Sequence, residues 1–307
     1  MILTGIDKRG RRITEDISTV QERGYLKENY RLFHLKDSRA QKLSYHYHDF
    51  DKIVLLLSGR VSYTVEGKRY FMKPGDILLV QHNMIHKPDI DPKLPYERMI
   101  LWIDKDHLKH IGGSSADLSA CFSLAHERSF HLLRTDRAGQ KALLTLFQRL
   151  EEADQSRESG HELLRDTYFL QLMLALSRES ERDRSDELRE TYRYDPKIED
   201  IMRYIETHPA EDLSVEALSG RYYLSRYYLM HRFKEVSGYT LHQYVNQKRL
   251  QYACELIHSG ESIMKAAELA GFQEYSTFLR VFRNSYHISP RAFQSGEAIE
   301  RGASLHE

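Results

Sequence analysis

The chain has 307 residues and carries 45 Lys and Arg against 45 Asp and Glu, so its formal net charge is zero. This length exceeds what one hydrophobic core usually supports, and two domains are therefore expected. Two cysteines and the lack of any run of about 18 apolar residues exclude a disulfide-rich secreted fold and a membrane-spanning helix, so we expect a cytoplasmic protein without membrane contact.

Residues 30–103 have a strand-like pattern. Short runs rich in Val, Ile, Leu and aromatic residues alternate with turn sequences that contain Gly, Pro or Asp. Many short strands at this spacing predict a small sandwich or barrel, and we assign residues 1–135 to this domain. The runs lie at 30–33, 53–57, 61–65 and 77–80.

Three histidines in this domain form a candidate site. His46 and His48 stand two residues apart, so on a strand they point to one face, and His86 can join them across the sheet. The pattern resembles that of the cupins over roughly 45 residues. Where cupins usually supply a glutamate ligand this sequence has Lys52, whose ammonium has no lone pair, and Asp51 should point to the other face. We therefore expect no metal and no other cofactor. If a metal did bind, the three histidines would be its candidate ligands.

A second interpretation makes this region a small-molecule pocket. Lys52 would then favour an anionic effector, provided that its side chain points inward. The proposed lining is His46, His48, Lys52, Tyr63 and His86. Two alternatives stay open: the histidines are hydrogen-bonded core residues of a domain that only dimerises, or the domain is a metal-dependent cupin enzyme with a helical accessory domain.

Residues 136–194 change to a helical period. Leu143, Leu144, Phe147 and Leu150 form one apolar face, and a second helix from about residue 163 to 176 is apolar nearly all round. Such a helix must be covered on more than one side. Packing on the strand domain would cover it, and so would pairing with a second chain; the two are compatible. Residues 178–193 are rich in charge and are predicted to be a linker.

Residues 195–295 form a basic C-terminal domain, because residues 221–295 hold ten Lys and Arg against five Asp and Glu. This balance suits a polyanion, although a solvated surface would give the same count. Asp195-Pro196 is a helix-start signal. The tail, residues 296–307, has almost nothing to bury and is predicted to be disordered.

The same short pattern occurs twice in this domain, with Phe233-Lys234 and Phe282-Arg283 placed 49 residues apart. Each copy has a supporting helix, a tight break and a second helix anchored by apolar residues. In the second copy Ile263, Ala266, Ala267 and Leu269 are expected to support. A helix that begins at Thr240 and ends at Ser259-Gly260 would be about 26 Å long, enough to set the two recognition helices about one duplex turn of about 34 Å apart. Two such helix-turn-helix units predict a DNA-binding domain.

The ordered run from Ser225, Leu229, Phe233 and Gly238 through Arg249 to Gly271, Phe278, Phe282 and Ser289-Pro290 resembles the AraC/XylS family of transcription regulators over about 95 residues. The resemblance implies a seven-helix domain whose third and sixth helices enter adjacent major-groove segments. It places the following residues toward DNA: Tyr227, Met230, His231, Tyr275, Ser276, Leu279 and Arg280 toward bases, Thr277 toward phosphate. By their exposure on the predicted helices, Arg226 and Arg283 join them.

Two positions depart from the family pattern. Tyr223 stands at the first turn, where the pattern has glycine, and Ser219-Gly220 weakens the first supporting helix by about 1 kcal/mol. The complete prediction is an α+β protein: a cupin-like sensor domain, a helical dimerisation segment and a double helix-turn-helix domain. We expect a homodimeric regulator of promoter DNA, not an enzyme and without catalytic residues. It would respond to a small-molecule effector, most commonly as an activator that contacts RNA polymerase.

Overall fold

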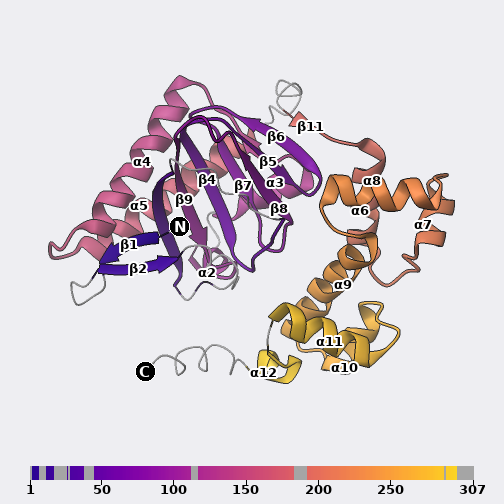
Figure 1. Cartoon of the computed structure of the whole chain (residues 1–307). Helices are drawn as coiled ribbons and strands as arrows, with labels where there is room; N and C mark the ends of the chain where they lie inside the picture. Colours follow the sequence, from indigo (N-terminus) through magenta and orange to yellow (C-terminus); the bar gives the residue numbers. More distant parts are fainter. Residues whose placement is uncertain are drawn as a thin grey trace. The chain divides into compact units, whose positions relative to one another are not determined.

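The computed structural model describes residues 2–6, 12–16, 26, 28–37, 45–111, 117–182, 192–286 and 288–295 (Figure 1). The chain divides into two compact units, Met1–Arg193 and Tyr194–Glu307, here called the N-terminal and C-terminal units. The tail predicted to be disordered lies outside the described residues, as do residues 183–191 of the predicted linker.

Two antiparallel sheets form a sandwich in the N-terminal unit. The five-stranded sheet has the order β10-β7-β4-β9-β3, the four-stranded sheet has the order β11-β6-β5-β8, and a separate hairpin pairs β1 with β2. The strands are β1 (Ile2–Ile6), β2 (Arg12–Asp16), β3 (Tyr30–Asp37), β4 (Asp51–Ser58), β5 (Val61–Val65), β6 (Lys68–Met72), β7 (Ile77–Val80), β8 (His86–Ile90), β9 (Tyr96–Ile103), β10 (Leu132–Leu133) and β11 (Tyr192–Arg193).

The period of two along β4 divides the apolar residues between two cores. Val54 and Leu56 point between the sheets, into an inner core that also holds Trp102, whereas Ile53 and Leu55 point to the outer face of the five-stranded sheet. All four β4 side chains are buried. Each contributes about 1.5–3 kcal/mol of transfer free energy, so one short strand is held firmly from both sides.

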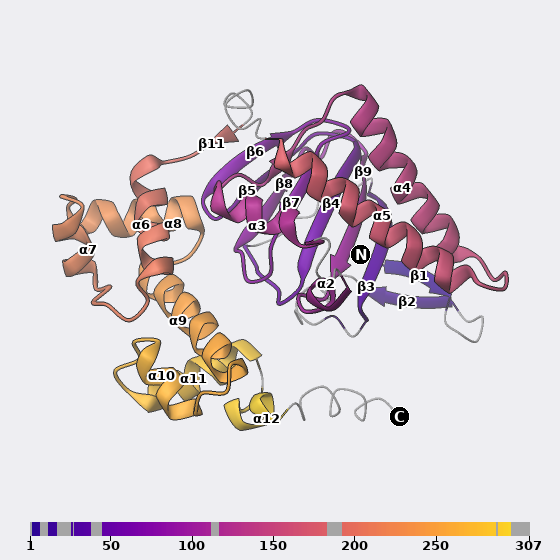
Figure 2. The ribbon, with the colours of Figure 1, turned by 180° about the vertical axis from the view of Figure 1, so that it is seen from behind.

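Helices cover the outer face of the five-stranded sheet, as Figure 2 shows from behind. Phe147 from α4 and Phe169 and Leu172 from α5 are buried in the outer core with Ile53 and Leu55 of the sheet. Packing on the strand domain, one of the two predicted covers for these helices, is therefore confirmed. The predicted linker begins later than residue 178, because α5 continues to Glu181. The helices are α2 (His107–Ile111), α3 (Ala120–Glu127), α4 (Arg137–Gln155) and α5 (His161–Glu181).

Among its described residues, the C-terminal unit consists of helices joined by turns and loops, without strands. Asp195 caps its first helix and Pro196 stands at the start, as predicted, because the Asp195 carboxylate accepts from the amides of Lys197 and Ile198. The helices are α6 (Pro196–Thr207), α7 (Val215–Arg221), α8 (Arg226–Ser237), α9 (Leu241–His258), α10 (Ile263–Leu269), α11 (Tyr275–Tyr286) and α12 (Pro290–Gln294). The predicted α+β class, with a β-sheet domain followed by a helical domain, is confirmed.

Candidate DNA interface and sensor cluster

The first helix-turn-helix unit consists of α7 and α8. Ser225 caps α8 by accepting from the amide of Tyr228 at 3.2 Å. Leu229 and Phe233 are fully buried, and Phe233 packs edge-on against Tyr244 of α9 with ring centroids 5.3 Å apart. These contacts fix one face of α8 and leave the other free of the core.

The exposed face of α8 carries the residues that the sequence pattern places toward DNA. Tyr227 is 76% exposed and stacks on His231 with ring centroids 6.1 Å apart, and Met230 is exposed beside them. Arg226 is exposed and pairs with Glu216 of α7 at 2.8 Å. This face therefore offers aromatic, apolar and cationic groups, which suit base edges, thymine methyl groups and phosphates.

The second unit consists of α10 and α11. Ala266 and Ala267 are buried, as are Phe278 and Phe282, which join them in one core cluster. The spacing of Leu269 predicts that it belongs to this core, but it is 38% exposed at the last position of α10. That part of the prediction is wrong.

The candidate DNA-facing residues of α11 divide by burial. Leu279 is half-buried and packs on the core cluster, so its side chain is committed to the protein. Thr277 is also half-buried. The exposed members are Tyr275, Ser276, Arg280 and Arg283. The two arginines are thus the cations of α11 that can approach a duplex.

Helix α9 connects the two units. Thr240 and Gln243 form a reciprocal capping box at its start, and its 18 residues span about 27 Å. It packs on α8 through Tyr244, which contacts Phe233, and on α6 through Lys248, whose Nζ donates to Glu206 at 2.9 Å. Leu250 and Ile257, farther along α9, belong to the core of the second helix-turn-helix unit. One continuous helix is therefore shared by both cores.

Arg249 makes a second link between the two helix-turn-helix units. Apart from its place in the family pattern, no local sequence signal predicts this role. Its guanidinium donates to the carbonyl oxygens of Pro209 and Glu211, both at 2.8 Å. Gly271, with φ of +87°, lies against the same segment, and a Cβ there would meet the Pro209 carbonyl at 2.6 Å. Both the left-handed backbone and the close approach require glycine.

In the N-terminal unit the structure brings His46, His48 and His86 together as predicted. The His86 ring lies 4.3 Å from that of His46 and 4.8 Å from that of His48, centroid to centroid. Lys52 does point inward: it is 2% exposed, and its Nζ lies 3.5 Å from Nε2 of His86. These four residues are called the sensor cluster below. The fifth candidate, Tyr63, lies in the inner core, where its hydroxyl meets that of Tyr96 at 3.1 Å.

Backbone carbonyls orient two of these imidazoles. Nδ1 of His48 donates to the Phe50 carbonyl at 2.7 Å, and Nδ1 of His86 donates to the Met84 carbonyl at 3.0 Å. Burial, and then the neighbouring charged groups, hold the pKa of both histidines well below the usual value. Neutral rings with Nδ1 protonated leave both Nε2 atoms as acceptors, and that of His48 is buried and has no hydrogen-bond partner among the described residues.

Lys52 occupies the position at which cupins have a glutamate ligand, and its surroundings explain the pKa of its amine. Burial, and secondly the charge of Arg98, lower the pKa of Lys52 to about 7. Asp51 points to the opposite face of β4, as expected, and accepts from the amide and Nδ1 of His82 at 2.7 and 2.8 Å. No group of three His, Cys, Asp or Glu within the described parts of the chain has the arrangement of a metal site.

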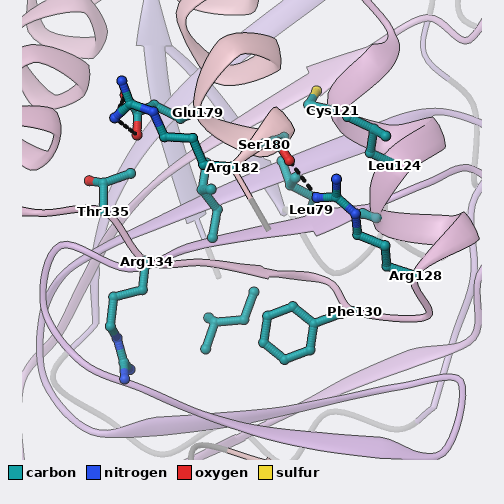
Figure 3. Close-up of a pocket in the computed structure, with 13 residues that line it drawn as sticks. Leu79, Cys121, Leu124, Arg128, Phe130, Arg134, Thr135, Glu179, Ser180 and Arg182 are labelled. Atoms are coloured by element: carbon teal, nitrogen blue, oxygen red, sulfur yellow. Dashed lines mark hydrogen bonds and ion pairs between the residues drawn. The ribbon is translucent and has the colours of Figure 1, made fainter. Parts of the chain in front are cut away.

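A small cleft lies elsewhere in the N-terminal unit, between α3, β10 and the end of α5 (Figure 3). Its volume is about 40 Å³, which is room for water rather than for an effector. Its cations are occupied: Arg128 donates to the Ser180 carbonyl at 2.6 Å, and Arg134 donates to both oxygens of Asp76. The cleft therefore has room for water only, and two of the cations that line it already have partners.

Comparisons with known proteins match both units. Residues 32–173 match the AraC-like ligand binding domain, and residues 218–296 match a helix-turn-helix domain. The HTH-type transcriptional activator RhaS of Enterobacter sp. (strain 638) is 27% identical over 264 residues, which cover 85% of this chain and 89% of RhaS. The chain belongs to the AraC family. The regulatory protein PocR of Salmonella typhimurium is 37% identical over 102 residues, 33% of this chain and 34% of PocR.

Among solved structures, ToxT from Vibrio cholerae O395 superimposes with a TM-score of 0.35 and 15% identity, covering 87% of this chain and 97% of ToxT. As a member of the AraC family, the protein is a DNA-binding transcription regulator with an N-terminal effector-binding domain. Within the described residues, the helices are too short or too polar to cross a membrane.

Proposed function

We propose that this AraC-family protein recognises a specific promoter sequence by inserting α8 and α11 into adjacent segments of the major groove. The observation that carries the proposal is the shared helix α9, because one 18-residue helix packed into both units holds the two exposed helix faces at a constant separation. Bases would be contacted by the exposed residues of those faces: Tyr227, Met230, His231, Tyr275, Ser276 and Arg280.

The contacts divide by chemistry. Arg280 can form a bidentate hydrogen bond with guanine, whereas Met230 can contact only a thymine methyl group. Arg226, Thr277 and Arg283 suit phosphates, which position the protein without selecting sequence. Leu279 packs on the core, so we assign it at most a marginal contact with bases.

We also propose that the sensor cluster binds the effector. Two imidazole Nε2 acceptors and the Lys52 amine would meet a small polar ligand that carries both hydroxyl and acidic groups. An anionic group beside Lys52 would favour its protonated form, so binding would take up a proton near neutral pH. The effector would act by binding one arrangement of the two units more tightly than the other.

The active form is proposed to be a cytoplasmic homodimer that contacts RNA polymerase and activates transcription; activation is what the name of RhaS states for that protein. Two leucines support the dimer: Leu163 is 73% exposed and Leu164 is 50% exposed at the start of α5. Exposed neighbouring leucines are common at interfaces between chains.

The test starts from a pool of random duplexes and the full-length chain at about 0.1 M salt. Repeated selection should enrich one sequence with two boxes about one duplex turn apart. Enrichment of no sequence over shuffled competitor would contradict the proposal. A thermal-shift screen of sugars, hydroxy acids and amino acids then seeks the effector, with His48→Phe as the matched variant that should lose the shift.

A further inference from the structure

Tyr223, in the turn of the first helix-turn-helix unit, has a backbone conformation that a tyrosine rarely adopts. Its φ is +53°, in the left-handed region. The Tyr223 amide donates to the Gly220 carbonyl at 3.4 Å, and the Leu224 amide donates to the Ser219 carbonyl at 2.9 Å. This pair of bonds is the Schellman ending of a helix, in which the left-handed position is usually glycine.

The second unit provides an internal comparison. Gly271 ends α10 in the same way, with its amide bonded to the Glu268 carbonyl and the Phe272 amide bonded to the Ala267 carbonyl. A side chain at Gly271 would collide with the Pro209 carbonyl. The chain thus places glycine at one of two equivalent turns and a bulky aromatic residue at the other.

The protein itself offers little compensation for this strain. Tyr223 is 94% exposed, the highest value among the exposed large apolar side chains of the described residues. Within the same described part of the chain, its ring and hydroxyl make no hydrogen bond or ring contact. A strained backbone conformation that no internal contact of the side chain offsets points to a functional role, here a contact with a partner.

The position of Tyr223 indicates the partner. It lies two residues before Ser225, the cap of the 12-residue helix α8, and the first turn of α8 contains no acidic residue. A helix N-terminus favours a negative charge, and the N-terminal end of a recognition helix is the part that meets the duplex. Arg226, at the first position of α8, adds a cation beside the turn.

We propose that the Tyr223 hydroxyl donates a hydrogen bond to a phosphate of the DNA backbone at the edge of the groove that α8 enters. This inference rests on the proposed function, which assigns α8 to the major groove. A phosphate contact is independent of sequence, so Tyr223 contributes to affinity and register and not to the choice of bases.

Two variants of the full-length chain separate the hydroxyl from the backbone strain. Tyr223→Phe keeps the ring and the strain, and should weaken binding about 3- to 10-fold on both the selected duplex and a shuffled duplex, without changing Tm. Tyr223→Gly should weaken binding at least as much while raising the Tm of the C-terminal unit by roughly 2–5 °C. Tyr252→Phe, at an exposed tyrosine of α9, is the control and should change neither value.

The salt dependence and a phosphate map complete the test. A neutral donor releases no condensed counterion, so the slope of log K against log salt should stay unchanged in Tyr223→Phe. Ethylation of one backbone phosphate should interfere with the wild type and not with Tyr223→Phe. Affinities within twofold of the wild type for both variants, or a loss in Tyr223→Gly alone, would overturn the contact. If Arg280→Ala still lost its preference for the selected duplex, the proposed function would stand while this inference fell.

Discussion

Inside the N-terminal sandwich, Nζ of Lys52 lies 3.5 Å from Nε2 of His86, and the amine is the donor in this pair. The direction follows from the other ring nitrogen, because Nδ1 of His86 is occupied in donating to the Met84 carbonyl. The two basic groups can therefore coexist in the interior without two positive charges.

Replacing Lys52 should change how stability depends on pH. Its folded-state pKa of about 7 lies below the ordinary value of 10.5, so between these two pH values the unfolded chain binds more protons than the folded chain. The stability of the N-terminal unit should therefore rise with pH across this window. Below pH 7 the full free-energy cost of burying the protonated amine of Lys52 is present. Lys52→Met should therefore stabilise the unit at pH 7 by a few kcal/mol, at about 1.4 kcal/mol for each pKa unit.

Urea unfolding of both proteins at pH 7 and at pH 10 measures this effect. The advantage of Lys52→Met should shrink as the pH rises, because the amine is neutral in both states of the wild type near pH 11. The variant Lys141→Met, at an exposed position on α4, should show no pH-dependent difference. A constant advantage for Lys52→Met at both pH values would contradict the lowered pKa.

Two glycine replacements in the C-terminal unit should have opposite signs. Gly271→Ala introduces a left-handed alanine and a contact of 2.6 Å with the Pro209 carbonyl, and should destabilise the unit by about 2 kcal/mol or more. Gly220 lies in α7, and no atom stands within 4 Å of the place where its Cβ would lie, so Gly220→Ala should stabilise the unit by about 0.5–1 kcal/mol. Thermal unfolding of both variants in parallel gives the comparison, and equal signs would refute this account of the two turns.

Arg280→Ala tests base recognition by α11. We expect a loss of about 1–3 kcal/mol on the selected duplex and a relaxed preference at one base pair, because a bidentate pair with guanine would be removed. Binding to each single-base variant of the selected site measures this directly. An equal loss on shuffled DNA would instead assign Arg280 to the backbone.

Arg283→Ala tests the contact with the phosphates. Arg283 is exposed one helical turn beyond Arg280, and its loss should weaken all duplexes alike. It should also lower the magnitude of the salt slope by about one, because one fewer phosphate is neutralised. A slope equal to that of the wild type would exclude this role.

The proposed dimer can be separated from the fold by changing two exposed leucines. The double variant Leu163→Glu and Leu164→Glu should shift sedimentation from dimer to monomer and reduce DNA affinity through lost avidity, while Tm at low concentration stays near that of the wild type. Gln171→Glu, an exposed change of the same charge sign on α5, is the control. Sedimentation of the wild type as a monomer at micromolar concentration would contradict the proposed dimer.

The sequence predicted what depends on local periodicity. The period of two places Lys52 inward and Asp51 outward, and Ser225, Thr240 and Pro196 mark helix starts because capping is a local property. Strands β6, β8 and β9 were not among the predicted runs; in β8 Pro88 interrupts the strand pattern, which an edge strand tolerates.

Other features required tertiary contacts that no local pattern encodes. Arg249 donates to two carbonyls about 40 residues away, and Leu269 is exposed although its spacing fits the apolar face. The pairing of Asp51 with His82 likewise depends on a loop brought across the sheet. Local signals therefore predicted many of the elements and the grouping of His46, His48, Lys52 and His86, whereas the contacts that link the elements depend on the tertiary structure.

With α8 and α11 in adjacent groove segments, as proposed, the shared helix α9 would also constrain the promoter. Inserting one base pair between the two boxes turns the second box by about 34° around the duplex axis and moves it by about 3.4 Å. A helix anchored in two cores cannot twist or lengthen to follow, so the protein would lose one of its boxes altogether. Evolution of its target sites should therefore tolerate base changes within a box more readily than any change in the number of base pairs between them.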